Sequence, residues 1–267
     1  MPRNLVTEKD LRKATRLPFC YLCGLELSSD FEENNRDHVP PKTCFQVKHR
    51  SSPLILPTHK TCNGARKVSD EMIGQYLSPF TRKAIRPENR KLQASIIGET
   101  EGNHLLEAFM SVNISDEVWR WLGAFHSTLY QEPWPQETQC GIQLPMPIAV
   151  PGPTGPTPDR FRGMHFGFVS KIKQNRAAHN VDRLVCNNGA VRYECVWFQP
   201  ALAQTWHCVF ALDFCGWGRL GRALCYPAHG CTGHYMLPSG MPPTLATRAL
   251  ELTVSTPNLE PSDPFGF

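Results

Sequence analysis

Four side chains of the kind that bind metals stand in two pairs near the N-terminus, and two residues separate the members of each pair. The first pair is Cys20 and Cys23, and the second is His59 and Cys62. Thiolate and imidazole groups are good zinc ligands, and four of them complete a tetrahedral site that leaves no position open for chemistry. The spacing therefore predicts a structural zinc ion. Gly24 supplies the free backbone that a turn behind the first pair needs.

Three further polar residues accompany these pairs. Asp37 and His38 are adjacent and lie between the pairs, and Asn63 directly follows Cys62. Asp37 and Asn63 can offer oxygen ligands to a divalent cation, and an imidazole with an ordinary pKa near about 6.5 can accept a proton from water. Two ligand pairs that arose by chance in a chain with 11 Cys would not be expected to flank such a group. We therefore expect a catalytic metal, Mg²⁺ or Mn²⁺, beside the zinc.

The segment from Cys20 to Asn63 resembles the HNH, or ββα-metal, endonucleases, most closely the zinc-containing branch that includes phage endonuclease VII. The resemblance covers about 60 of the 267 residues. It implies that the two ligand pairs bind structural zinc, that Asp37 and Asn63 hold the catalytic metal, and that His38 is the general base. It thus implies a metal-dependent endonuclease that hydrolyses phosphodiester bonds in DNA.

The same resemblance suggests substrate contacts and reveals two departures from the family. Arg66 lies where many members have a Lys three residues after the Asn, and Arg66 and Lys42 are the expected substrate-binding residues. His59 stands where Cys is commoner, which remains good zinc chemistry. Leu54 occupies the position of the middle Asn, which is thought to brace the loop in this family.

Charge is divided unevenly along the chain. Residues 1–98 carry 17 Lys and Arg against 10 Asp and Glu, a net charge of +7, whereas residues 99–267 carry 11 against 14, a net charge of −3. A basic segment that contains the motif suits a polyanionic substrate. DNA is therefore the expected partner, with RNA left open. A double-strand cut by one active site per chain would favour a homodimer.

A competing interpretation is a non-catalytic zinc-ribbon module that binds nucleic acid. It explains the zinc ligands and the basic charge. It gives no reason for Asp37, His38 and Asn63 to coincide with them.

The patterns together predict an α+β fold. An N-terminal zinc-stapled ββα-metal motif with flanking helices would precede a C-terminal region with an antiparallel sheet. The expected divisions are a nuclease domain over 1–98, a packing-helix region over 99–131, a Pro/Gly-rich loop or linker over 132–159 and a mainly-β region of unknown role over 160–267.

Local signals place the elements of the N-terminal part. Thr7 and Asp10 predict a capping box at the start of a short helix. Residues 36–39 and 54–56 are the expected strands of the motif, and its helix is expected to start near Asn63.

Local signals also place the elements that follow. Residues 115–131 form the clearest predicted helix, with one apolar stripe. The stripe contains Val118, Leu122, Phe125 and Leu129. Alternating patterns predict antiparallel strands over 164–168, 191–197 and 206–212, with a hairpin turn at Asn187-Asn188-Gly189 before the second of them.

Cysteine usage and the N-terminal residues bear on location. Thr7 to Leu17 is charged throughout, unlike a signal peptide, and no apolar run approaches the length of a membrane span. The odd number of Cys fits metal ligands and buried thiols better than disulfides. We expect a cytoplasmic protein without a membrane partner. A second zinc site could be formed by Cys225, His229, Cys231 and His234. The simpler interpretation is that these residues are packing thiols and surface His.

Overall fold

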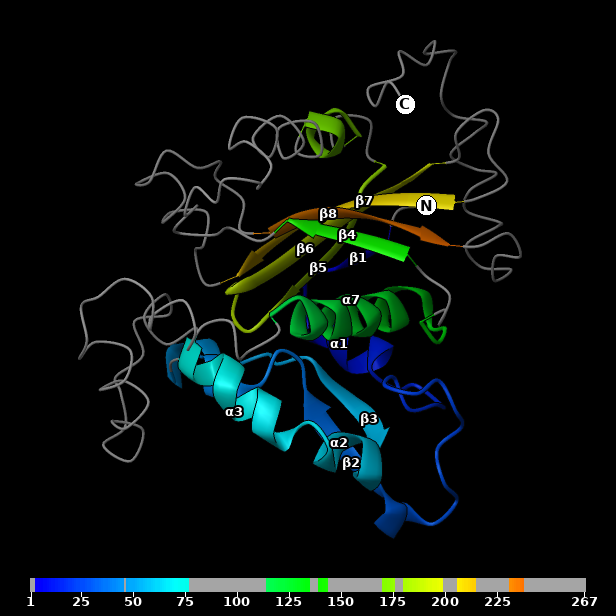
Figure 1. Cartoon of the computed structure of the whole chain (residues 1–267). Coiled ribbons are helices and arrows are strands. Elements are labelled where there is room, and N and C mark those ends of the chain that lie inside the picture. Colours follow the sequence, from blue (N-terminus) through cyan, green and yellow to red (C-terminus); the bar gives the residue numbers. More distant parts are fainter. Residues whose placement is uncertain are drawn as a thin grey trace, which may run out of the picture.

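A computed structural model describes residues 3–45, 47–76, 114–134, 139–143, 170–175, 180–198, 206–214 and 231–237. Within these residues the protein is an α+β structure with a two-stranded sheet and a six-stranded sheet, and helices lie between them (Figure 1). The α+β class predicted from the sequence is confirmed.

The small sheet lies in the N-terminal part. Its strands are β2 (Asn34–His38) and β3 (Ile55–His59), which pair antiparallel so that Asp37 faces Leu56 and His38 faces Ile55. The two expected strands are therefore present, each displaced by one or a few residues. Three short 3₁₀ helices connect this part of the chain: η1 (Phe31–Glu33), η2 (Lys42–Cys44) and η3 (Val47–His49).

Two helices follow the small sheet without a long loop. Helix α2 (Lys60–Gly64) begins directly after β3, and α3 (Lys67–Tyr76) follows it. The helix predicted to start near Asn63 begins earlier, at Lys60, because His59 has extended backbone (φ −73°, ψ 147°) and acts as the N-cap. Asn63 therefore lies near the end of α2, and its place is set by the turn that also carries Cys62.

Helix α1 (Glu8–Ala14) has the predicted capping box. The Asp10 N–H donates to Oγ1 of Thr7 at 3.2 Å, and the Thr7 N–H donates to Oδ2 of Asp10 at 3.3 Å. These reciprocal bonds satisfy two backbone donors that a helix start otherwise leaves unpaired. Leu11 is the buried residue of this helix and joins the main core.

The large sheet contains strands from both ends of the chain. In spatial order it runs β1-β5-β6-β7-β8-β4. The strands are β1 (Asn4–Leu5), β4 (Gln139–Gln143), β5 (Asp182–Cys186), β6 (Val191–Phe198), β7 (Trp206–Phe214) and β8 (Cys231–Leu237). All neighbours pair antiparallel except β1 and β5, which are parallel.

Two features of this sheet differ from the sequence-based expectations. The N-terminal strand β1 joins its edge, and β4 lies inside the segment 132–159 that was predicted to be loop or linker. The strands expected over 191–197 and 206–212 are present as β6 and β7. The strand expected over 164–168 lies outside the described residues.

Helix α7 (Ile114–Tyr130) lies between the large sheet and the part of the chain that contains the small sheet and α3 (Figure 1). The helix predicted over 115–131 is thus confirmed, and all four residues of its apolar stripe are buried. Burial extends beyond the stripe, since Trp121 stacks on Phe214 of β7 with ring centroids 5.3 Å apart. Buried residues of both chain halves form one contiguous core. The expected boundaries near 98 and 159 lie outside the described residues.

The other face of the large sheet carries a smaller apolar cluster. Residues 170–175 form a short helix, and its Ile172 packs with Val196 and Val209. The helical residue Lys171 places its ammonium 5.2 Å from the ring centroid of Phe198. None of the helices in the described part of the chain is long and apolar enough to cross a membrane.

The turn between β5 and β6 contacts the loop that precedes β3. Asn187, Asn188 and Gly189 all have positive φ, as the predicted hairpin turn requires. The Asn187 side-chain amide donates to the carbonyl of His49 at 3.1 Å, and the Asn188 amide donates to that of Lys48 at 3.3 Å. The large sheet thereby holds the backbone of a basic loop beside the small sheet.

Candidate metal centre

A tight turn presents Cys20 and Cys23. The Gly24 N–H donates to the carbonyl of Cys20 at 2.8 Å, and the Cys20 N–H donates to the carbonyl of Leu25 at 2.8 Å. Gly24 has φ +77°, and a Cβ there would lie 3.1 Å from Cβ of Pro133. Both backbone freedom and space therefore favour glycine at this position.

The second pair of ligands comes from the junction of β3 and α2. His59 ends β3, and Cys62 lies in the short helix that begins after it. Nδ1 of His59 lies 3.4 Å from Sγ of Cys23 and 3.9 Å from Sγ of Cys62. The ligand atoms of the four predicted zinc residues, Cys20 included, all lie within 4.8 Å of one another.

These distances suit a tetrahedral zinc ion, whose ordinary bond lengths separate the ligand atoms by about 3.5–3.8 Å. Nε2 of His59 lies 3.0 Å from the carbonyl oxygen of Glu26. A hydrogen on Nε2 would donate to that carbonyl, which leaves the Nδ1 lone pair directed at the thiols. The cluster could therefore hold a structural metal such as zinc.

The thiols also influence each other electrostatically. Burial, together with the neighbouring Cys20 and Cys23 sulfurs, raises the pKa of Cys62 to about 11. Burial opposes ionisation of Cys23, but hydrogen bonding to the backbone of Leu25 and to the other ligands lowers its pKa. A bound cation would favour the thiolate form of all three sulfurs.

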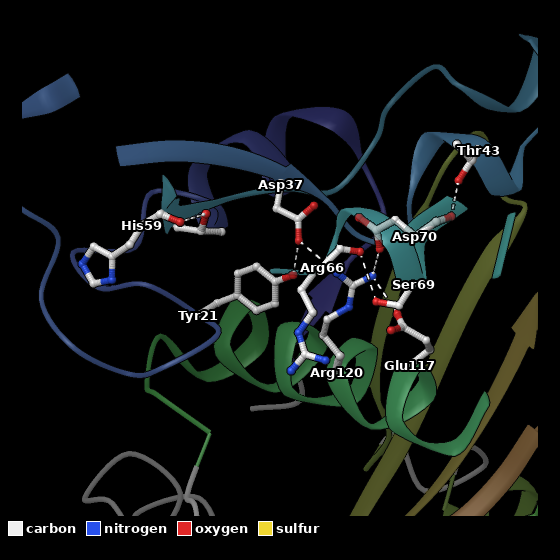
Figure 2. A network of polar contacts seen from close by, with 10 residues as sticks. Tyr21, Asp37, Thr43, His59, Arg66, Ser69, Asp70, Glu117 and Arg120 are labelled. Atoms are coloured by element: carbon white, nitrogen blue, oxygen red, sulfur yellow. Dashed lines mark hydrogen bonds and ion pairs between the residues drawn. The ribbon is translucent and has the colours of Figure 1, made fainter. Parts of the chain in front are cut away.

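Asp37 is buried between the small sheet and α7, with 5% of its surface exposed. The Tyr21 hydroxyl donates a hydrogen bond to its Oδ2 atom. Nη1 of Arg120 lies 3.5 Å from the same oxygen. In Figure 2 the other carboxylate oxygen of Asp37 points away from both partners. Oδ1 accepts no hydrogen bond from the described residues.

His38 follows Asp37 on β2 and is half-buried. Burial and the positive charge of Lys42 lower its pKa below the ordinary value, although the Asp37 carboxylate acts in the opposite direction. The imidazole is therefore neutral at pH 7, as an acceptor of protons must be. No hydrogen bond ties its ring to another described residue.

Asn63 is fixed through its neighbour Cys62 in α2, a helix that lies against β2 and β3. Its side chain is partly exposed, and among the described residues it forms no hydrogen bond. The structure thus brings the four zinc residues into contact. Asp37 contacts Tyr21 and Arg120, and among the described residues no hydrogen bond joins its side chain to Asn63 or His38.

The two expected substrate contacts, Arg66 and Lys42, both have exposed side chains. Arg66 lies in the turn between α2 and α3, where its backbone N–H donates to the carbonyl of Asn63 at 3.0 Å. Lys42 begins η2, close enough to His38 to influence its pKa. Both cations are free to meet an anionic ligand from solvent.

The buried charged cluster around Arg120 was not predicted from the sequence. Its guanidinium contacts Asp37 of β2, Asp70 of α3 and Glu117 of α7, the last with an N–O distance of 2.8 Å (Figure 2). The Arg120 side chain is only 3% exposed. A charged residue inside the apolar helix α7 was the available signal, because an Arg is almost never buried without a partner.

Burial alone would lower the pKa of Arg120, but the surrounding acidic groups raise it. Burial also raises the pKa of Asp70 to about 6, against the opposing effect of Arg120. Burial and the Asp37 carboxylate raise the pKa of Tyr21 well above its ordinary value. Tyr21 is therefore a neutral donor, and Arg120 remains a cation.

The fold and the site define an α+β protein with a Cys₃His cluster in its N-terminal part. A scan against protein-family models found no match, and searches of curated proteins and of solved structures found no significantly similar protein. The suggested second zinc site is not described: Cys225 and His229 lie outside the described residues, and only the backbone is described for Cys231 and His234.

Proposed function

We propose that the protein is a metal-dependent endonuclease of the HNH type that hydrolyses phosphodiester bonds in DNA. The supporting observation is the state of Asp37, whose carboxylate is held through Oδ2 while Oδ1 accepts no hydrogen bond from the described residues. Carboxylates that bind metals are usually oriented in this way by hydrogen bonds to their second oxygen.

The arrangement of the ββα elements supports the same proposal. Asp37 and His38 lie on β2, and Asn63 lies on α2, which packs against that strand. The Cys₃His cluster joins the turn before β2 to the start of α2, so a bound zinc ion would fix the two elements relative to each other. A bound zinc ion would then set the local geometry of the site together with the apolar core that the small sheet shares with α7.

Each residue has a role in this proposal. Oδ1 of Asp37 and the side-chain oxygen of Asn63 would hold Mg²⁺ or Mn²⁺, which when bound stabilises the negative charge that develops on the phosphate. The neutral imidazole of His38 would accept the proton of the attacking water. Lys42 and Arg66, both exposed, would contact phosphate oxygens and orient the backbone.

One observation favours the competing function, a non-catalytic nucleic-acid-binding module. Asp37 already has an ion-pair partner in Arg120 and a hydrogen-bond donor in Tyr21, so its carboxylate is stabilised without a metal. In that case the Asp would brace β2 against α7, and the basic surface would bind nucleic acid without cleaving it.

Plasmid nicking with Mg²⁺ or Mn²⁺ distinguishes the two functions. We expect the wild type to nick supercoiled DNA and His38→Ala to lose at least about 100-fold in rate, since general bases contribute on that scale. Zinc content should be unchanged, because His38 is not one of the clustered ligands. His207→Ala is the matched control, because His207 is also half-buried with a lowered pKa but lies on β7.

The outcomes separate cleanly. Nicking by the His38→Ala variant at the wild-type rate would remove His38 from the mechanism. Absence of nicking by every variant, with zinc and DNA binding intact, would favour the binding module. Parallel assays with single-stranded and RNA substrates define the range of nucleic acids cleaved.

A further inference from the structure

We propose that Tyr21 and Arg120 are positioning residues that set the orientation of Asp37 for its divalent cation. This inference rests on the proposed function and extends it to two residues outside the Asp37, His38 and Asn63 set. Both donors contact one oxygen, Oδ2, and approach it from different elements (Figure 2). A carboxylate with one oxygen fixed in this way can turn little about its last torsion.

Tyr21 connects Asp37 to the zinc cluster. It lies between the ligands Cys20 and Cys23 and is 3% exposed, so a metal on those thiols would restrict its backbone. Its N–H also donates to the carbonyl of Pro57 in β3 at 3.4 Å. Binding of zinc would therefore reach the Asp37 side chain through the Tyr21 hydroxyl as well as through the pairing of β2 with β3, which carries His59.

Arg120 connects Asp37 to the large sheet. It belongs to α7, whose next residue, Trp121, stacks on Phe214 of β7. The guanidinium is held by Glu117 of the same helix and by Asp70 of α3. Because these partners share the guanidinium, its position relative to Asp37 is fixed by packed elements on both sides.

Loss of the Tyr21 hydroxyl contact should act on metal affinity more than on the fold. Residues that orient a ligand through a hydrogen bond commonly change metal affinity by about 10- to 100-fold when mutated. Tyr21→Phe removes the hydroxyl and keeps the buried ring. We expect it to weaken Mn²⁺ binding by about tenfold while the zinc content stays that of the wild type.

Tyr130→Phe is a matched control from the same chain. Tyr130 is also buried, and its hydroxyl donates to a buried carboxylate, Oδ2 of Asp182, at 2.7 Å. The Tyr130 pair lies in the large-sheet core rather than at the small sheet. The Tyr130 hydroxyl also accepts from Nε1 of Trp197 at 2.7 Å, so we expect this variant to lose at least as much stability as Tyr21→Phe and to bind Mn²⁺ as the wild type does.

The experiment is a titration of the zinc-loaded full chain with Mn²⁺. Electron paramagnetic resonance measures the concentration of free Mn²⁺ at each step, and DNA nicking is measured in parallel. Arg120→Lys provides a second test, because it keeps the charge but cannot reproduce the planar guanidinium contacts. Arg120→Lys should also weaken Mn²⁺ binding. If Tyr21→Phe loses zinc, Arg120→Lys is the variant that tests the positioning role.

Equal Mn²⁺ affinity in wild type, Tyr21→Phe and Arg120→Lys would overturn the positioning role and leave the nuclease proposal intact. A wild type that binds no Mn²⁺ and nicks no DNA would overturn the proposed function itself, and the inference with it. Weaker binding in Tyr21→Phe but not in Tyr130→Phe is the supporting result.

Discussion

The guanidinium of Arg120 lies 3.5 Å from Oδ2 of Asp37, although 83 residues separate them in the sequence. This contact joins β2, which carries the proposed catalytic pair, to α7, the helix at the centre of the core. The Asp37 carboxylate therefore contacts both Tyr21, which lies between two residues of the Cys₃His cluster, and Arg120 of α7. Several measurable consequences come from this arrangement.

Replacing the Arg120 charge should be strongly destabilising. Arg120→Met keeps most of the side-chain volume but leaves Asp37, Asp70 and Glu117 without their cation. Uncompensated buried charges of this kind cost about 3–5 kcal/mol. Urea denaturation should show this loss in the free energy of unfolding.

Arg183→Met is the control for a partly exposed ion pair. Arg183 lies 2.9 Å from Glu194, but its side chain is 42% exposed. Solvent screening should limit its loss to about 1 kcal/mol or less. Similar losses for the two variants would show that the buried cluster is not held by Arg120.

Asp70 should make stability depend on pH. Its pKa is raised on folding from 3.8 to about 6, mainly by burial. A raised carboxyl pKa means that the folded state holds the proton more tightly, so this stabilisation is present below pH 3.8 and is lost as the pH rises through about 6. Asp70→Asn cannot titrate. The variant should therefore gain stability relative to wild type as the pH rises from about 4 to 7.

We expect that gain to be about 1–2 kcal/mol, because partial exposure of Asp70 reduces the effect of burial. Chemical denaturation of both proteins at several pH values measures it. The charge-dependent part of the Asp70 contact with Arg120 is already contained in the pKa of Asp70, and the rest of the contact adds a constant offset, so only the slope matters. A difference that does not change with pH would contradict the raised pKa.

Removing a ligand from the Cys₃His cluster should release its metal. Cys62→Ser should lower bound zinc from one ion per chain toward zero and should loosen β2, β3 and α2, because structural zinc contributes directly to folding. Elemental analysis and hydrogen exchange measure the two effects. Cys44→Ala is the control, since Cys44 is fully buried but lies outside the cluster. A Cys62→Ser protein that kept its zinc would contradict the assignment.

Asn63 should affect cleavage without affecting the cluster. Asn63→Ala removes the proposed oxygen ligand and leaves Cys62 in place, so zinc content should be unchanged while nicking falls by at least the roughly 10- to 100-fold that loss of a ligand-orienting residue causes. Thr61→Ala, an exposed position of the same helix, should cleave normally. If Asn63→Ala weakened DNA binding but cleaved bound DNA at the normal rate, its role would be substrate contact instead.

The turn of Asn187 and Asn188 allows a paired test of how the large sheet supports the basic loop. Both residues have positive φ, which Gly adopts without strain, so each Asn→Gly change removes mainly the side-chain amide. The Asn187 amide is buried and bonds to His49, so Asn187→Gly should lose about 1 kcal/mol. Asn188 is exposed, and Asn188→Gly should lose less than about 0.5 kcal/mol.

Urea denaturation gives both values, and hydrogen exchange over residues 47–52 reports loosening of the loop. The turn backbone also contacts the loop, since the Asn187 N–H donates to the carbonyl of Ser52 at 2.8 Å. That bond remains in both variants. Equal losses in the two variants would show that the amide contact with His49 contributes little.

Features that depend on neighbouring residues were predictable from the sequence. The Thr7 and Asp10 capping box, the turn that presents Cys20 and Cys23, and the helix containing Val118 are all specified by residues within a turn or two. The clustering of the zinc residues was also predictable, because paired ligands with short spacing can converge on one ion.

The position of β4 and β1 in the large sheet was not predictable in the same way. Residues 139–143 contain a Gly and two Gln and have little intrinsic preference for a strand, and β1 has only two residues. Each forms because the edge of a completed sheet offers backbone partners, β8 in one case and β5 in the other.

The residue types near Cys20 and Cys62 thus determined that a metal-binding cluster would form and which side chains would stand next to it. Only the tertiary structure decided what Asp37 contacts. Its partner Arg120 could be recognised in the sequence as a charge inside an apolar helix, but not matched to a carboxylate. That pairing depends on how α7 packs between two sheets, which is a property of the whole core and not of any local pattern.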